Sequence, residues 1–300
     1  MNHRLNAFTV DVEDYFQVEN FAGQIDRKTW ERYPSRIEAN TERVLALLER
    51  HGVRGTFFIL SWNAERYPEL VRAIAGAGHE IASHGYGHQL VYELEPEEFA
   101  RDVTRAKLEL ERLAGTKVLG YRAPSYSITT QSRWAFAHLL AAGYRYDSSI
   151  YPIRRRRYGI PGAPRFPHRV AEGLVEFPMT TWRVGGVNLP AASGGYLRIL
   201  PLSVSIAAVS QLNRAGHPAV VNVHPWELDP EQPRLGGGYL GGFTHYANLH
   251  TTADRLGALL DRFRFGTMRQ TLEHAGFTLH DSATDGAAAG ATSLTHPRSA

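Results

Sequence analysis

The chain has 300 residues, of which 43% are apolar and 21% charged, a composition typical of a soluble globular enzyme. Its 33 basic and 30 acidic residues give a net charge of +3, too small to indicate nucleic-acid binding. There is no cysteine, which excludes disulfides, thiol catalysis and cysteine-ligated zinc. We expect a cytoplasmic location, because the sequence shows no secretory leader and no apolar segment long enough to span a bilayer.

Strand-like and helix-like segments alternate through the first half of the chain. An apolar strand over 6–12 ends in acids, and a helix then begins at Ser35, with Glu38 completing a capping box and Gly52 just past its end. The next predicted elements are a strand over 55–60, a helix over 67–77, a strand over 79–82, a helix over about 96–113, a strand over 118–121, a helix over 131–142 and a strand over 144–147.

The second half begins with a long irregular stretch over 152–169, rich in proline and arginine, which predicts an insertion or lid near a strand end. The elements predicted after it are a strand over 174–177, a helix over 202–214, a strand over 219–223, helices over about 252–263 and 267–274, and a strand over 277–280. The glycine-rich stretch 234–245 is expected to be a loop. We expect one domain over 1–281, with a C-terminal extension from about 235 and a disordered tail over 282–300.

Seven or eight short strands in repeated βα order predict an α/β fold, a distorted (β/α)7-8 barrel with parallel strands. Catalytic groups of such barrels come from the carboxyl ends of several strands. Polar side chains stand at five predicted strand ends: Asp11/Glu13/Asp14, His84/His88, Arg122, Asp147 and His224. Five such clusters at one rim predict a shared site, because isolated caps or salt bridges rarely coincide in this way.

The four-residue spacing of His84 and His88 places both imidazoles on one face of a turn, where they can hold one metal ion. Two histidines and one carboxylate, with open positions for water and substrate, are a common catalytic zinc set. Strand alternation puts Glu13 on the same side as Asp11, whereas Asp14 takes that place if the chain has already turned. Both acids stay candidates, with Glu13 slightly favoured.

Five motifs in this order resemble those of the polysaccharide deacetylases of carbohydrate esterase family 4, the NodB-homology group. They are Thr-Val-Asp-Val-Glu-Asp-Tyr-Phe (9–16), Ser-His-Gly-Tyr-Gly-His (83–88), Gly-Tyr-Arg-Ala-Pro-Ser-Tyr-Ser (120–127), Tyr-Asp-Ser-Ser (146–149) and His-Pro-Trp-Glu-Leu-Asp-Pro (224–230). The sequence looks most like the subgroup associated with PEP-CTERM exopolysaccharide loci. The resemblance covers about residues 8–280.

The resemblance implies a hydrolase that removes N-acetyl groups from amino sugars of a bacterial exopolysaccharide or of its lipid-linked precursor. It implies one divalent metal ion, usually Zn²⁺, held by His84, His88 and one of Glu13 or Asp14. The residues that it places against the substrate are Pro124, Tyr126 and Trp226.

The resemblance also implies a role for each polar strand end. Asp11 would be the general base, with Arg122 fixing its orientation and charge, and His224 would protonate the leaving amine. The backbone N–H of Tyr126 would face the developing oxyanion. Asp147 would brace the Arg122 or the His224 side of the site.

The sequence departs from the usual family pattern at two points. The family has two adjacent aspartates, where this chain has Asp11 followed by Val12, Glu13 and Asp14. Gly85 also replaces the usual serine or threonine after the first histidine, which removes a hydroxyl contact. Both imidazoles remain.

Two alternatives to deacetylation stay open at this point. The same fold could hydrolyse a cyclic amide or imide, or the chain could be a catalytically degenerate, sugar-binding member. The basic run Arg154–Arg157 is interpreted first as a solvated loop. Its other interpretation is contact with an anionic polymer or a lipid surface, which would place the protein at the periphery of the inner membrane.

Overall fold

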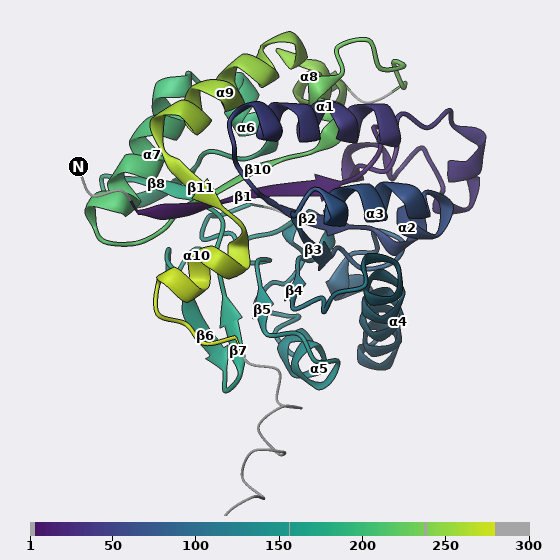
Figure 1. Ribbon diagram of the computed structural model, residues 1–300, viewed down its shortest axis with the longest axis horizontal. Helices are drawn as coiled ribbons and strands as arrows, with labels where there is room; N and C mark the ends of the chain where they lie inside the picture. The colour runs from purple at the N-terminus through teal and green to yellow at the C-terminus, as the bar shows by residue number, and fades with distance from the viewer. Residues whose placement is uncertain (1–3, 156, 237–238, 280–300) are drawn as a thin grey trace, which may run out of the picture.

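The computed structural model of the protein describes residues 4–155, 157–236 and 239–279 (Figure 1). One sheet has the strand order β10-β1-β2-β3-β4-β5-β7-β6, and β11 pairs with β1 off this path. Neighbouring strands are parallel, except that β6 is antiparallel to β7. The strands are β1 (Leu5–Val12), β2 (Thr56–Ile59), β3 (Glu80–Ser83), β4 (Gly120–Tyr121), β5 (Tyr146–Asp147), β6 (His168–Ala171), β7 (Leu174–Glu176), β10 (Val220–Val223) and β11 (Arg264–Gly266).

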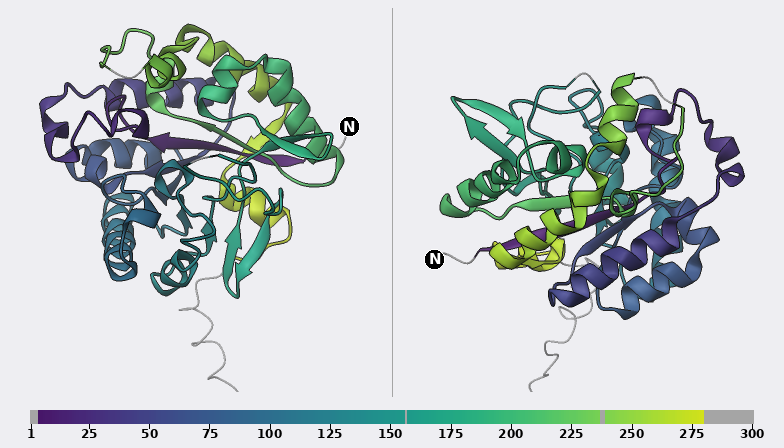
Figure 2. Two further views of the ribbon diagram at one scale, coloured as in Figure 1. Left: turned by 180° about the vertical axis from the view of Figure 1, so that it is seen from behind. Right: turned by 90° about the horizontal axis from the view of Figure 1, so that it is seen from above.

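Helices surround the curved sheet, and β1 crosses the middle of the molecule (Figures 1 and 2). The α-helices are α1 (Ile37–Arg50), α2 (Ser61–Arg66), α3 (Pro68–Gly76), α4 (Pro96–Ala114), α5 (Ala135–Ala141), α6 (Gly194–Ile199), α7 (Leu202–Arg214), α8 (Tyr239–Tyr246), α9 (Thr252–Arg262) and α10 (Met268–His274). The short 3-10 helices are η1 (Glu19–Phe21), η2 (Arg27–Arg32), η3 (Val91–Glu93), η4 (Pro124–Tyr126), η5 (Pro225–Leu228) and η6 (Leu249–Thr251).

The side chains of β1 alternate between two hydrophobic clusters. Phe8, Val10 and Val12 belong to the large cluster that packs against the helices, whereas Ala7 belongs to a smaller cluster inside the curve of the sheet. Because side chains alternate along a strand, Asp11 shares the inner side with Ala7. A buried acid is therefore held in the hollow of the sheet rather than under the helices.

The strand register brings the carboxyl ends of the parallel strands to one edge. Val12 is aligned with Ile59, Ile59 with Ser83, and Ser83 with Tyr121. On the other side of β1, Val10 is aligned with Val223. The residues that follow these strand ends, among them Glu13, His84, Arg122 and His224, consequently converge at the same rim.

The predicted α/β fold is confirmed, and the sheet is a curled half-barrel rather than a closed one. Within the described residues its two ends, β10 and β6, do not pair with each other. Beside β10, an isolated parallel bridge joins Ser193 to Asn222.

Several sequence-based predictions of local structure are wrong. The capping box at Ser35 is absent, because α1 is capped at Arg36 and the Ser35 hydroxyl donates to Asp14 Oδ2 instead. The expected loop over 234–245 contains α8, and residues 277–279 form no strand. The sequence also gave no indication of α6, β11 or the hairpin of β8 (Thr181–Val184) and β9 (Val187–Pro190). His280 and the tail 282–300 lie outside the described residues.

Within the described part of the chain, no helix combines the length and the apolar character needed to cross a membrane.

Candidate active site

A buried group of two histidines and one carboxylate stands at the rim. Glu13 Oε1 lies 2.8 Å from His84 Nε2 and 3.1 Å from His88 Nε2, and all three side chains are almost inaccessible to solvent. Burial raises the pKa of Glu13, but the neighbouring His88, His224 and His84 lower it more, so that the pKa lies well below 4.5. Glu13 is therefore an anion between two imidazoles.

The orientation of His84 indicates that a cation belongs in this group. Its Nδ1 lies 2.8 Å from the carbonyl oxygen of Arg122, an acceptor that requires Nδ1 to carry the proton. In the neutral ring, Nε2 then presents a lone pair toward the anionic oxygen of Glu13. Two such acceptors face each other favourably only across a proton or a metal ion, and a backbone-anchored histidine is the usual arrangement of a metal ligand.

The loop that carries His88 is held in an uncommon conformation. His88 has a φ of +55°, in the left-handed region that non-glycine residues rarely adopt. Arg27 Nη2 donates to the His88 carbonyl oxygen at 2.9 Å, and Gly85 also has a positive φ, of 75°. Such strain is retained where the surrounding structure fixes a functional side chain.

Asp14, the alternative third ligand, is engaged elsewhere. Its Oδ2 accepts hydrogen bonds from the Ser35 hydroxyl at 2.7 Å and the Arg36 backbone N–H at 2.9 Å, and its Oδ1 accepts from Tyr15 N–H at 2.9 Å. Asp14 thus anchors the chain that enters α1. Of the two candidate acids, the geometry favours Glu13 as the ligand.

Asp11 lies beside this group in a buried polar network. Arg122 Nη1 donates to Asp11 Oδ1 at 2.7 Å, and Asn222 Nδ2 donates to Asp11 Oδ2 at 2.9 Å. Arg122 is fully buried; Nη1 also donates to Thr9 and Asn222, and Nε and Nη2 donate to Ser148. The carboxylate is consequently fixed by two partners, with Oδ2 directed toward His224 Nε2 at 3.8 Å.

His224 follows β10, the strand beside β1, and its carboxylate partner is Glu227. His224 Nδ1 lies 2.7 Å from Glu227 Oε1, and Arg198 Nε donates to Glu227 Oε2 at 2.6 Å. Burial alone would lower the pKa of His224, but the surrounding acids Glu13, Glu227 and Asp11 raise it to about 9. Burial raises the pKa of Glu227, but the positive charges of Arg198 and His224 lower it more, to about 2.

Asp147 lies on the Arg122 side of the site and does not contact His224. Its Oδ1 accepts from the Ser149 hydroxyl at 2.6 Å, and Ser149 Oγ in turn accepts from the Ala123 N–H at 2.8 Å. Burial raises the pKa of both Asp147 and its neighbour Glu176, and the charge of Asp147 raises the pKa of Glu176 further. Asp147 therefore supports the loop that follows Arg122, through the hydroxyl of Ser149.

The expectation for the Tyr126 backbone does not agree with the geometry. Its N–H donates to the Ala123 carbonyl oxygen at 3.0 Å, which closes the turn η4 and leaves no free donor for a substrate oxygen. The Tyr126 hydroxyl instead accepts from Asn222 Nδ2 at 3.1 Å. Pro124 is buried and does not line the adjoining pocket, whereas Ser125 and Tyr126 do.

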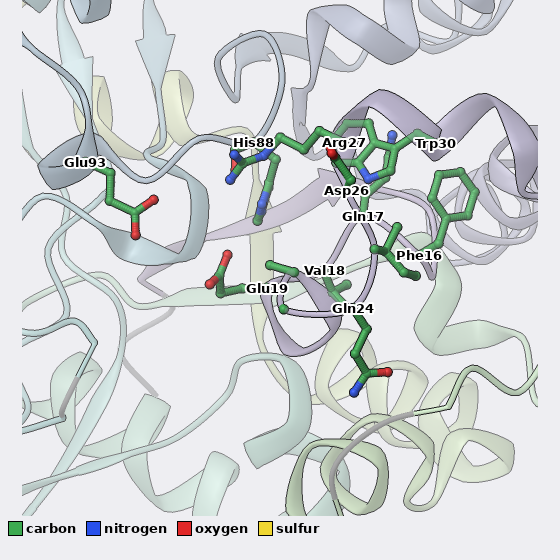
Figure 3. A pocket seen from close by; sticks show the side chains of 13 residues that line it. Phe16, Gln17, Val18, Glu19, Gln24, Asp26, Arg27, Trp30, His88 and Glu93 are labelled. Carbon is green, nitrogen blue, oxygen red and sulfur yellow. The ribbon is translucent and has the colours of Figure 1, made fainter.

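A pocket of about 310 Å³ opens over these groups, and its lining includes Asp11, Glu13, His88, Tyr126 and His224. Trp226 also lines it, stacked on the His224 ring with centroids 5.4 Å apart. A second hollow of about 580 Å³ lies among residues 16–30 and Glu93 (Figure 3). Val18, Glu19 and His88 line both spaces, so the two hollows meet beside the histidine–glutamate group.

Three residues of the network escaped the sequence analysis: Asn222, Glu227 and Arg198. The sequence does contain a sign that Asn222 is functional, because it is the polar residue within an otherwise apolar strand. Glu227 could also have been found, because it stands three residues after His224 with Pro225 between them, which is the spacing of a capping box. The structure contains this capping box. The sequence pattern around Arg198 does not indicate its role.

The rim has the composition of a hydrolytic metal site: a set of His and Glu side chains that fits one divalent ion, an adjacent carboxylate, and an opposed imidazole. Within that class, part of the chain is similar to the polysaccharide deacetylases. Residues 28–146 match the family described as polysaccharide deacetylase, and residues 148–273 match a domain of unknown function, DUF3473.

Individual relatives agree with this assignment over part of their length. A peptidoglycan-N-acetylglucosamine deacetylase of Bacillus cereus is 35% identical over 96 residues, which are 32% of this chain and 35% of the relative. A chitooligosaccharide deacetylase of a Bradyrhizobium strain is 31% identical over 91 residues, 30% of this chain and 42% of the relative. The matched regions thus span less than half of these relatives.

A solved structure extends the similarity of fold to nearly the whole chain. The crystal structure of a Mycobacterium smegmatis protein described as a polysaccharide deacetylase has a TM-score of 0.62 at 23% identity. The match covers 99% of this chain and 95% of that one. It supports the fold of both matched segments, each of which contributes strands to the large sheet.

Proposed function

We propose that the protein is a metal-dependent hydrolase that removes N-acetyl groups from amino sugars of a bacterial exopolysaccharide or of its lipid-linked precursor. The observation that carries the proposal is the convergence of Glu13, His84 and His88 on one point, beside Asp11 and His224, which line the same pocket. The deacetylase names of the relatives support the reaction class.

An amide is a poor electrophile with a poor leaving group, so its hydrolysis needs activation at both ends. A divalent ion such as Zn²⁺, held by His84, His88 and Glu13, would polarise the acetyl carbonyl and acidify a water molecule. Asp11, oriented by Arg122 and Asn222, would accept a proton from the attacking water. The same two partners keep its Oδ2 at the pocket side.

His224 would supply the proton that allows the sugar amine to leave as a neutral molecule. Its raised pKa keeps the ring protonated near neutral pH. Glu227 fixes which nitrogen faces the pocket, because its Oε1 accepts from Nδ1 and leaves Nε2 toward Asp11. Base and acid thus line the same pocket, with Asp11 Oδ2 3.8 Å from His224 Nε2.

We expect one divalent ion per chain and acetate release that stops on chelation. Acetate should be measured with a panel of N-acetylated oligosaccharides, with and without chelator, and metal content by elemental analysis. Glu13→Ala and His84→Ala should lose both metal and activity, because each removes one of three ligands. Asp14→Ala is the matched control: it should keep the metal and lower only the stability of the loop before α1.

Full metal occupancy in a His84→Ala/His88→Ala variant would contradict the proposed metal site. Metal-independent turnover of a cyclic imide would contradict the proposed reaction and favour the cyclic-imide alternative.

Glu227→Gln should shift the pH profile as well as the rate. Removal of the anion lowers the pKa of His224, so the basic limb of the kcat profile should move to lower pH while metal content stays unchanged. Glutamine keeps the shape of the side chain, although Arg198 loses its anionic partner. A purely structural role would reduce the folded fraction and leave the position of the basic limb where it was.

A further inference from the structure

Charge is distributed unevenly along the chain. Residues 148–226 contain nine arginines, no lysine and only two acids, Glu172 and Glu176, a net charge of 9 − 2 = +7. The remainder of the chain has 33 − 9 = 24 basic and 30 − 2 = 28 acidic residues, a net charge of −4. Glu176 and Arg198 are both buried, so neither contributes much to the charge of the surface.

The β8–β9 hairpin in this basic segment exposes apolar side chains. It forms a two-stranded sheet of its own, beside α7 (Figure 1). Val184, Val187 and Leu189 are 44%, 60% and 39% exposed. They are three of the seven large hydrophobic side chains that are exposed in the described part of the chain. Such a concentration at one projecting turn indicates contact with an apolar phase.

Arginines surround this apolar hairpin. A groove of about 580 Å³ between the hairpin and the preceding loop is lined by Arg154, Arg155 and Arg183. All three are exposed. The ion pairs found within the described residues include neither Arg154 nor Arg183, so both guanidinium groups can bind an external anion. Arg156, in the same run, lies outside the described residues.

Polar bonds hold this surface in a fixed shape. Asn188 Nδ2 of β9 donates to the Pro152 carbonyl at 2.8 Å, and Arg165 Nη2 donates to the Thr181 carbonyl at 2.6 Å. Gln211 of α7 binds the backbone of Arg183 in both directions, at 3.0 and 2.9 Å. The hairpin is therefore presented on a built platform, and binding through it needs little ordering.

We propose that the β8–β9 hairpin and the arginines beside it bind the surface of an anionic lipid bilayer. The arginines would contact the phosphates, and Val184, Val187 and Leu189 would enter the boundary between headgroups and acyl chains. The exposed apolar side chains favour a lipid bilayer over a soluble polyanion, because a soluble polyanion would bind through the arginines alone. The surface also adjoins the catalytic pocket, because the segment that gives Arg154 and Arg155 to the groove gives Arg157 and Tyr158 to that pocket.

The test is sedimentation of the full chain with vesicles of phosphatidylcholine alone or mixed with phosphatidylglycerol. Binding should require the anionic lipid and should weaken with salt. Arg154→Ser/Arg183→Ser should reduce vesicle affinity by roughly 25-fold, about fivefold for each arginine. Val184→Asn/Val187→Asn should reduce it by about tenfold or more, since these side chains would no longer gain from leaving water.

Matched controls come from α4, where Arg101 and Leu108 are also exposed. Arg101→Ser and Leu108→Asn should leave vesicle binding unchanged. Unfolding midpoints of all variants should agree with that of the parent, since none of the replaced side chains is buried. None of these residues belongs to the catalytic pocket, so a failure here leaves the proposed hydrolysis untouched.

Three outcomes would overturn the proposal. The first is equal binding to neutral and anionic vesicles, or binding to neither. The second is binding to a soluble anionic polysaccharide that survives the valine replacements while vesicles are not bound. The third is a concentration-dependent dimer, detected by light scattering, that the valine replacements abolish, since the hairpin would then meet a second copy of the chain.

Discussion

Arg122→Lys should lower turnover by a factor on the order of a hundred, although the charge is kept. The guanidinium group is fully buried and donates to Asp11, Thr9 and Asn222 through Nη1, and to the carbonyl and hydroxyl of Ser148 through Nε and Nη2. A lysine ammonium has three donors at one point and cannot reach acceptors on both sides. Asp11 would therefore lose the partner that fixes its orientation.

The readouts for Arg122→Lys should separate orientation from folding. We expect kcat to fall while KM and metal content change little, because neither the pocket lining nor the ligand set includes Arg122. The unfolding midpoint should drop as well, since buried acceptors are left unpaired. Near-normal kcat in the folded variant would mean that Arg122 is only a structural ion pair.

The positions of the site residues could be predicted because each is coupled to a strand end. Apolar runs before Glu13, His84 and His224 mark the strands, and parallel pairing then brings their carboxyl ends together. Strand alternation favoured Glu13 over Asp14 on the condition that the strand continued as far as Glu13, whereas β1 ends at Val12. The structure adds what the sequence could not show, namely that Asp14 has another task at the start of α1.

The side chains that support the site were harder to predict. Arg198 is 29 residues from Glu227 along the chain and sits on the six-residue helix α6, which has no clear hydrophobic period. The three-residue strand β11 is too short for an alternating pattern, and its place beside β1 depends on packing between distant segments. Local patterns identify residues that end an element; they do not identify buried partners that meet only after the sheet has curled.

Asp147 was expected to brace either the Arg122 or the His224 side of the site, and the carboxylate beside His224 is a different residue, Glu227. Asp147 ends β5 and supports the Arg122 loop through Ser149, whereas Glu227 comes from the turn that His224 itself begins. The nearer residue has the advantage of a short, fixed connection: Glu227 Oε1 accepts from both the ring Nδ1 and the backbone N–H of His224. Histidine and carboxylate are thus held as one rigid unit.

His224→Ala should lower amide hydrolysis by a factor on the order of a hundred or more and leave the metal bound. The proposed role of the ring is to protonate the departing amine, which leaves poorly as an anion. An aryl acetate ester has a much better leaving group and should lose far less rate. The comparison of an N-acetylated oligosaccharide with an aryl acetate, together with metal analysis of the variant, therefore isolates proton donation from other effects of the replacement.

The pH dependence of the parent protein tests the same role of His224. A general acid acts in its protonated form, so kcat for the amide should fall as pH rises through the pKa of His224. The pKa of about 9 sets the highest pH at which this basic limb should lie. A divalent ion beside Glu13 would offset part of the negative charge that raises the pKa above 6.5, so the limb should lie at or below that pH. In His224→Ala the limb should disappear and the residual rate should stay level or rise with pH. If amide and ester lose rate equally, or if the variant keeps the same basic limb, His224 positions other groups and does not donate the proton.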